Sequence, residues 1–368
     1  MSANPFTIIA TVPNMERVEA ILGAEGARPD YFRLNLSHCT VQQAVDFLTA
    51  YNQRCGDIPI FLDLQGSKIR LLREQPTITV NAGEEVVVCS APIAGKTCLL
   101  VDAQVVRTCI EACGTHPSIT ALIDDGKVEL RLLHPTSDAF VPATVVRGGK
   151  VLPRKGFNLS PHPICLTTLT TVDHEFVVKT RVFPCVRYAL SFVSDPREIV
   201  ALRETVGRDA PCSRHARGCF VAAKLERALS VAETRALGAV SDEMWLCRGD
   251  MGSQLGLPGL AQFYRAFVHV MPSFGCPVIL AGEVLDHMPM AGISTRSEVC
   301  HLADAVERGY TGCVLSNETV CPSTDNALAA IRLVRAVTAA AQADRIVGSP
   351  FGDWWAEAQR ALAEAKKH

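Results

Sequence analysis

The chain has no long apolar run and almost no imbalance of charge. No hydrophobic stretch approaches the length of a bilayer span, and residues 1–20 carry no basic-then-apolar signal. The 36 basic and 38 acidic residues leave a net charge of -2, which argues against a surface specialised for nucleic acid. We therefore expect a cytoplasmic protein that acts on small molecules, with neither a membrane nor a nucleic acid as its partner.

Two recurrent sequence signatures are also missing. The 15 cysteines form no Cys-x-x-Cys pair and follow no repeated spacing. This distribution is typical of small thiols in a reducing compartment, and not of zinc sites or a disulfide framework. No Gly-x-Gly-x-x-Gly follows the first predicted strand, which weakens a dinucleotide-binding interpretation.

Short apolar runs alternate with helical patterns over most of the 368 residues. Eight runs are predicted as strands, at 7–12, 31–34, 58–62, 188–193, 219–225, 243–247, 277–281 and 312–315. Helical periodicity fills most of the stretches between them. The alternation predicts an α/β protein in which residues 1–66 and 156–344 form a closed (β/α)8 barrel, also called a TIM barrel. An open doubly wound sheet is the alternative.

The alternation is interrupted between residues 67 and 155. Short β-like pieces replace it, separated by turn sequences such as Asn81-Ala-Gly83 and Asp124-Asp-Gly126. This predicts a small all-β lid domain inserted after the third barrel strand, which could close over a site and exclude water. At the other end of the chain, residues 345–368 are predicted to form a tail with a helix.

The most informative residues lie where two apolar runs end in charge. The segment 219–226 ends in Lys224 and Glu226, and the segment 246–250 ends in Arg248 and Asp250. Because the carboxyl ends of barrel strands meet at one rim, these side chains are expected to share a site. Two carboxylates and an ammonium suffice to hold a divalent cation with a positive charge beside it.

The second predicted strand continues into a polar segment. Arg33, Asn35 and Ser37 alternate there, so all three are expected to point to the same side. Three polar groups with a single charge suit a phosphate or a monovalent cation. Ordinary surface alternation is the other interpretation of this segment taken alone.

Two further strand ends carry polar groups. Asp63 follows the third predicted strand, and Lys68 and Arg70 follow at the entry to the insertion, where a charged linker is the alternative. Ser316 and Glu318 alternate after the eighth strand. A single polar strand end means little, but one rim that collects several of them predicts an active site.

These residues belong to motifs that together resemble the pyruvate kinase family over about residues 7–340. The motifs are Arg33-Leu-Asn-Leu-Ser-His38, Leu62-Asp63 with Gly66 and Ile69-Arg70, Ile123-Asp-Asp-Gly126, Arg154-Lys-Gly-Phe-Asn-Leu159, Ala223-Lys-Leu-Glu226, Arg248-Gly-Asp-Met-Gly252, Ser294-Thr-Arg-Ser-Glu298 and Leu315-Ser-Asn-Glu-Thr319. Their order and spacing also agree with the family. The family fold is a (β/α)8 barrel with a β-rich lid after strand three, which matches the change of pattern described above.

The resemblance implies roles in catalysis and metal binding. Glu226 and Asp250 would coordinate Mg²⁺ or Mn²⁺ together with substrate oxygens. Lys224 would lie at the transferring phosphoryl group and stabilise charge on the enolate oxygen. The other catalytic residues implied are Arg33 and Arg70, which would face phosphate groups, and Ser316 and Glu318, which match a polar cluster linked to proton delivery.

The resemblance also implies three sets of binding residues. The substrate would contact Arg248, Gly249, Asp250 and Gly282. A monovalent cation or its substitute would be held by Asn35, Ser37, Asp63, the carbonyl of Leu64 and Lys68. The nucleotide would contact Pro13, His38, Arg70 and Lys155.

Several residues depart from the family pattern. Lys68 replaces the Glu of K⁺-dependent members, so K⁺ is not expected to be required. Gly282 and Glu283 replace the usual Thr and Gln, which enlarges the site and adds a charge. The loop 11–14 is one residue shorter and lacks a Gly before its Pro. Because the chain stops after the eighth barrel helix, we expect a short, divergent member without the C-terminal regulatory domain, able to pair as a homodimer through barrel helices.

The resemblance implies an Mg²⁺-dependent phosphotransferase. It would act on phosphoenolpyruvate or pyruvate with ADP or ATP, through an enolate stabilised by the metal. The alternative is a divergent enzyme of specialised metabolism that uses the same enolate for carbon–carbon bond cleavage or formation, for decarboxylation, or for another phosphoryl acceptor. A binding or regulatory protein without catalysis is the third hypothesis.

Overall fold

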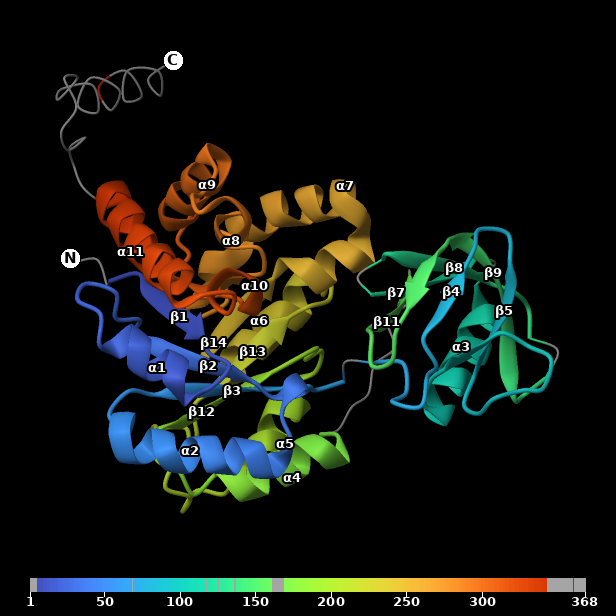
Figure 1. The fold of residues 1–368 in the computed structure, drawn as a ribbon, viewed down its shortest axis with the longest axis horizontal. Coiled ribbons are helices and arrows are strands. Elements are labelled where there is room, and N and C mark those ends of the chain that lie inside the picture. The colour runs from blue at the N-terminus through green and yellow to red at the C-terminus, as the bar shows by residue number, and fades with distance from the viewer. Residues whose placement is uncertain are drawn as a thin grey trace.

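A closed barrel of eight parallel strands forms the body of the protein. The computed structural model describes residues 5–342, except 68, 117, 125, 136 and 161–168, together with residue 360. The strands close in the order β1-β16-β15-β14-β13-β12-β3-β2, with helices on the outside (Figure 1). Their bounds are Thr7–Thr11 (β1), Tyr31–Asn35 (β2), Ile60–Leu64 (β3), Val186–Leu190 (β12), Val221–Leu225 (β13), Glu243–Cys247 (β14), Val278–Ala281 (β15) and Gly312–Leu315 (β16). The predicted (β/α)8 barrel is confirmed, and the open sheet is wrong.

The barrel strands are buried along their whole length where the site lies. Every residue of β3, β13 and β14 is buried, because these strands face the barrel interior on one side and helices on the other. Two strands are displaced from their predicted positions: β3 lies two residues later, and β12 starts two residues and ends three residues earlier. Pro59 has no N–H to donate, so β3 starts after it and includes Asp63. β12 ends at Leu190, which leaves Ser191 just beyond the strand.

Four of the outer helices begin at a capping box. Thr40, Asp195, Ser230 and Thr295 each form a capping box with a Gln or Glu three residues later. The helices are α1 (Met15–Leu22), α2 (Val41–Cys55), α4 (Thr171–Thr180), α5 (Pro196–Val206), α6 (Val231–Val240), α7 (Arg248–Val270), α8 (Met288–Ala291), α9 (Arg296–Glu307), α10 (Asn317–Val320) and α11 (Thr324–Ala341), with 3-10 turns η1 (Leu36–His38) and η2 (Met271–Ser273). None of the helices in the described part of the chain is long and apolar enough to cross a bilayer.

The insertion stands beside the barrel and has a hydrophobic core of its own (Figure 1). Its six-stranded sheet has the order β11-β7-β8-β9-β5-β6, and β10 pairs with β4 in a second sheet. The bounds are Ile78–Val80 (β4), Glu85–Cys89 (β5), Cys98–Leu100 (β6), Ile119–Ile123 (β7), Val128–Leu132 (β8), Phe140–Arg147 (β9), Gly149–Val151 (β10) and Phe157–Ser160 (β11). A helix, α3 (Ala103–Thr115), adds to the predicted strands and packs its buried face on them.

Two further predictions concern the cysteines and the tail of the chain. All cysteines in the described ranges are free thiols, and most are buried. The predicted tail helix at 345–368 lies outside the described residues, except for residue 360.

Candidate active site

A cavity of about 340 Å³ opens at the carboxyl ends of the barrel strands. It gathers predicted site residues that are far apart in the sequence. Those that line it are Arg33, Asn35, Ser37, Asp63, Arg70, Lys224, Glu226, Gly249, Asp250, Gly282, Ser316 and Glu318. Closure of the barrel brings these strand ends together, as expected for the rim of this fold.

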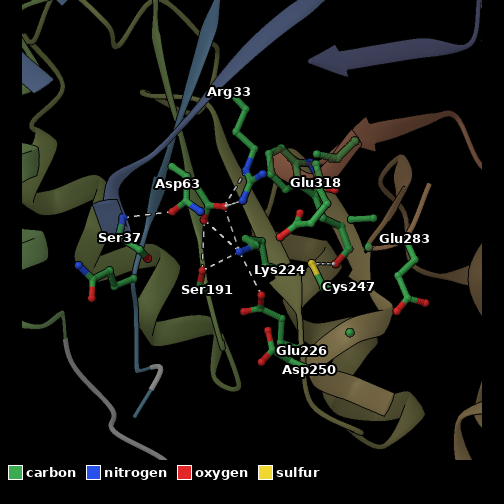
Figure 2. A pocket seen from close by; sticks show the side chains of 18 of the residues that line it. Arg33, Ser37, Asp63, Ser191, Lys224, Glu226, Cys247, Asp250, Glu283 and Glu318 are labelled. Atoms are coloured by element: carbon green, nitrogen blue, oxygen red, sulfur yellow. Dashed lines mark hydrogen bonds and ion pairs between the residues drawn. The ribbon is translucent and has the colours of Figure 1, made fainter. Parts of the chain in front are cut away.

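Lys224 lies at the centre of a buried charge cluster (Figure 2). Its Nζ donates to both carboxylate oxygens of Asp63, at 3.0 and 3.1 Å, and to Ser191 Oγ at 2.8 Å. It also lies 3.0 Å from Glu226 Oε1. Because an ammonium has three protons, these three partners account for all of them. The side chain is therefore held in one position, with no proton left over.

Arg33 is the second cation on Asp63. Its Nε donates to Asp63 Oδ2 at 2.8 Å, its Nη2 lies 2.5 Å from the same oxygen, and its Nη1 donates to Thr11 Oγ1 at 2.8 Å. Burial alone would raise the pKa of Asp63, but Lys224 and Arg33 outweigh it and hold the pKa below its usual value. Burial would lower the pKa of Lys224, and the two neighbouring carboxylates reverse that effect. Asp63, Lys224 and Arg33 are therefore ionised at neutral pH.

Glu226 and Asp250 provide a pair of carboxylates beside this cluster. Figure 2 shows their side chains next to each other, close to Lys224. Glu226 Oε2 accepts a hydrogen bond of 2.8 Å from the backbone N–H of Phe192, and Asp250 lies in the first turn of α7. Within the described ranges, no three His, Cys, Asp or Glu side chains are grouped to hold a metal. A pair of carboxylates still fits Mg²⁺ or Mn²⁺, because Mg²⁺ commonly takes one or two carboxylates and fills its other positions with water and substrate oxygens.

The N-terminus of α7 lies at the cavity, where Gly249 and Asp250 form part of the lining. The residue before the helix, Cys247, makes no side-chain capping bond. Gly282 lies opposite, with φ of 81°, and a Cβ at this position would lie 3.2 Å from the backbone nitrogens of Arg248 and Gly249. A side chain here would be strained and would occupy the space in front of these groups. An uncapped helix start beside a glycine suits a carboxylate ligand.

Arg248, a predicted substrate-binding residue, lies outside the lining of this cavity. Its guanidinium donates to the carbonyl of Gly282 at 2.9 Å and to that of Glu283 at 2.8 Å. Its Nη1 also lies 2.6 Å from His301 Nε2. Arg248 therefore anchors the loop after β15 and faces a second cleft between α7 and the insertion.

The predicted monovalent-cation residues are already engaged with protein groups. β2 ends at Asn35, so Ser37 lies in the turn η1 and does not continue the strand alternation. Asn35 Oδ1 accepts from the N–H of Ser37 at 3.1 Å, because this side chain caps the turn. The carbonyl of Leu64 accepts from the N–H of Ser191 at 3.3 Å. Lys68 lies outside the described residues.

The predicted nucleotide residues are not assembled in the cavity. Pro13 is exposed and Lys155 pairs with Asp124 of the insertion at 2.9 Å, and neither lines the cavity. Only Arg70 does, where its Nη2 donates to Ser37 Oγ at 3.4 Å and its Nη1 to the carbonyl of Arg154 at 3.0 Å. The side chain of His38 lies outside the described part of the structure.

Sequence reasoning missed several residues that build the site. Ser191 was placed inside a strand, and only the true end of β12 reveals its position on Lys224. Trp245 and Cys247 line the cavity but resemble ordinary core residues in the sequence. Asp286 also lines it, five residues beyond the end of β15 at Ala281, where strand periodicity no longer gives any signal.

Comparisons with known proteins identify relatives of this chain. A pyruvate kinase from Thermotoga maritima is 24% identical over 85% of this chain, and one from Agrobacterium vitis is 30% identical over 85%. The chain spans 66% and 64% of the lengths of these two relatives. The crystal structure of a pyruvate kinase from Cryptosporidium parvum has a similar fold, with a TM-score of 0.75 and 21% identity, covering 91% of this chain and 69% of that one.

The family comparison covers most of the chain. The family described as "Pyruvate kinase, barrel domain" matches residues 4–323. This range begins before β1 and ends beyond β16, so it includes all eight barrel strands and the insertion. The chain therefore belongs to the pyruvate kinase family.

Proposed function

We propose that the cavity binds pyruvate or phosphoenolpyruvate with Mg²⁺ or Mn²⁺, and that the protein transfers a phosphoryl group between this 2-oxo acid and a nucleotide. The observation that carries the proposal is the buried cluster in which Lys224 contacts Asp63, Ser191 and Glu226. A cation fixed in this way suits stabilisation of negative charge that develops on a substrate oxygen, because no reorganisation is needed during the reaction.

The neighbouring groups divide the remaining tasks. Glu226 and Asp250 would hold the divalent cation, which when bound would neutralise charge on substrate oxygens. The backbone N–H groups at the start of α7 would bind the substrate carboxylate. Arg33 and Arg70 would face the phosphoryl group. Phosphoryl transfer needs alignment and charge neutralisation more than covalent chemistry, and the cavity is built from groups of that kind.

A second candidate is a divergent enzyme that uses the same enolate chemistry without a nucleotide. Two observations favour it. Gly282 and Glu283 leave space and add a carboxylate beside the proposed carboxylate subsite. Pro13 and Lys155 do not line the cavity. We also propose that K⁺ is not required, because Arg33 and Lys224 already bind both oxygens of Asp63.

Pyruvate release from phosphoenolpyruvate, ADP and Mg²⁺ tests the first candidate. We expect the Lys224→Met variant to lose activity by about 10²–10³-fold or more, the usual effect of removing a fixed group that stabilises transition-state charge. Lys179→Met, at an exposed lysine of α4, is the matched control. Equal activity of the Lys224→Met variant and the wild type would contradict the proposal.

Calorimetry separates the two candidates. Oxalate, which mimics the enolate of pyruvate, should bind with Mg²⁺ in either case. Titration of that complex with ADP and with ATP should release heat only if the nucleotide is a substrate. Binding of oxalate without binding of either nucleotide would favour the divergent enzyme.

A further inference from the structure

The loop after β15 and the start of α10 carry a hydrogen-bonded cluster that the proposed chemistry has not used. Ser316 and Asp286 both line the cavity, and Ser316 Oγ lies 3.3 Å from Asp286 Oδ1. Thr319 Oγ1 lies 2.5 Å from the same oxygen. The resemblance to the family implies that Ser316 and Glu318 belong to one polar cluster. The carboxylate that actually contacts Ser316, among the described residues, is Asp286.

A count of protons indicates that Asp286 can carry one. The hydroxyl of Thr319 lies 2.5 Å from Asp286 Oδ1 and 2.9 Å from the carbonyl oxygen of Val284. A hydroxyl has one proton, and a carbonyl oxygen can only accept. If the Thr319 hydroxyl donates its proton to the carbonyl of Val284, it cannot also donate to Asp286. The short contact with Asp286 is then a hydrogen bond only if the Asp286 carboxyl group carries the proton and donates it to Thr319 Oγ1. The geometry therefore accommodates a neutral Asp286 as well as an ionised one.

The charges around Asp286 favour the neutral form. Burial is the main cause that raises the pKa of Asp286, with added repulsion from Glu318 on α10 and Glu283 on the same loop. The hydroxyls of Thr319 and Ser316 oppose this shift, and Arg248 of α7 is the nearby cation. The net result is a pKa above the usual value for Asp. Such a carboxyl group gains and loses a proton more readily near neutral pH.

The opposite wall of the cavity is a poor source of protons. Asp63 is held ionised by Lys224 and Arg33. The carboxylates on Lys224 raise its pKa, so its ammonium is a weak acid at neutral pH. An enolate is planar, and the face that does not meet Lys224 would look toward β15 and β16. On that side Ser316 and Asp286 both line the cavity and are hydrogen-bonded to each other.

We propose that Asp286, acting through Ser316, exchanges a proton with C3 of the bound 2-oxo acid; this rests on the proposed function. When the enolate forms, the C3–H electron pair becomes the C2–C3 double bond and the C2 carbonyl becomes an enolate oxygen. Ser316 Oγ takes the C3 proton and passes its own proton to the carboxylate of Asp286. In the reverse direction C3 regains a proton from Ser316, and Asp286 restores that proton and is left ionised.

Exchange of the pyruvate methyl protons with D2O in the presence of Mg²⁺, followed by NMR, isolates this step from phosphoryl transfer. We expect Asp286→Asn to slow the exchange by about 10²–10⁴-fold, the usual contribution of a general acid or base. Ser316→Ala should slow it similarly, and the double variant should be little worse than either single variant, because the two residues act as a unit. Asp209→Asn, at an exposed position after α5, is the matched control.

A pH profile distinguishes proton transfer from a merely structural role. Exchange needs ionised Asp286, so its rate should rise with pH through the pKa of this group. Thr319→Val removes a hydrogen bond that stabilises the ionised carboxylate of Asp286 more than the neutral carboxyl group. The pKa of Asp286 should therefore rise, and the increase of the exchange rate with pH should move to higher pH. Calorimetric binding of Mg²⁺ and oxalate by each variant checks that the site is still folded.

The possible outcomes separate the two proposals. If the wild type exchanges protons and Asp286→Asn exchanges at the same rate with an unchanged profile, the role of Asp286 is wrong and the proposed function stands. If the wild type neither exchanges protons nor releases pyruvate from phosphoenolpyruvate, the proposed function fails, and the role of Asp286 fails with it. An unchanged profile in Thr319→Val would also overturn the role of Asp286.

Discussion

The two ends of the barrel both bury charge, but they hold it in different ways. At the carboxyl end, Lys224 and Arg33 share Asp63 through direct ion pairs. At the amino end, the guanidinium of Arg187 lies 4.4 Å from the ring centre of Tyr31 and 4.2 Å from that of Phe220. The carboxyl end presents its charges to a cavity, whereas the amino end covers its charge with aromatic rings.

Trp245 connects these two ends inside the barrel. It lines the cavity, and its Nε1 donates to Glu243 Oε1 at 2.6 Å near the amino end. Its ring packs edge-on against Phe61, at 5.0 Å between centres. At the carboxyl end, ion pairs hold charged side chains in place beside a cavity where they can act on a ligand. At the amino end, aromatic rings and one indole N–H only stabilise the polar groups that are buried there. Mutations should therefore have different signatures at the two ends.

The largest effect is expected from Asp63→Ala. This change leaves Lys224 and Arg33 close together in a buried site without their shared counter-ion, at a cost of about 3–5 kcal/mol of unfolding free energy. Urea denaturation measures it. Asp57→Ala is the control, because Asp57 is 79% exposed in a 3.6 Å pair with Arg28 and should change stability by less than about 1 kcal/mol.

A double variant sharpens this prediction. Adding Lys224→Met to Asp63→Ala removes one of the two cations that shared Asp63 and so relieves their repulsion, and part of the lost stability should return. If the double variant is as unstable as the sum of both single variants, charge pairing is not what stabilises the carboxyl end.

At the amino end, the expected effect is a pH dependence of stability. Burial raises the pKa of Glu243 to about 7, although Trp245 and Arg187 oppose the shift. The folded protein therefore prefers neutral Glu243, and stability from this group is full below the unfolded pKa of about 4.3 and is lost as pH rises to about 7.

Glu243→Gln should remove this dependence while keeping the acceptor for the indole N–H. Relative to the wild type, the variant should gain about 3 kcal/mol of unfolding free energy between pH 4 and pH 8, an upper value at about 1.36 kcal/mol per pKa unit. Urea titrations at several pH values measure the gain, with Glu204→Gln at an exposed site of α5 as the control. If the unfolding free energies of the wild type and of Glu243→Gln change with pH in parallel, Glu243 does not titrate in this range.

The smallest effect is expected from Arg187→Lys. Lysine keeps the positive charge but loses the flat guanidinium that lies over the rings of Tyr31 and Phe220. We expect a loss of about 1 kcal/mol, the scale of a cation–π contact, seen as a lower thermal midpoint. A loss above that of Asp63→Ala would reverse the comparison between the two ends.

The sequence determined much of the barrel and part of the site. Apolar runs ending in charge located β13 and β14, and the carboxyl ends of both strands were correct, because the buried run of a parallel strand closes there. The motifs then placed Lys224, Glu226 and Asp250 at the rim, and all three line the cavity.

Only the tertiary structure decided which of these residues contact one another. Ser191 reaches Lys224, Arg248 turns to the loop after β15, and Asp286 meets Ser316 across 30 positions of the chain. No local pattern records these contacts, because they depend on barrel closure and on loops beyond the strand ends, where side-chain periodicity stops. Hydrophobic periodicity specifies which segments are buried, whereas the partner of a buried charge is fixed only when distant segments meet.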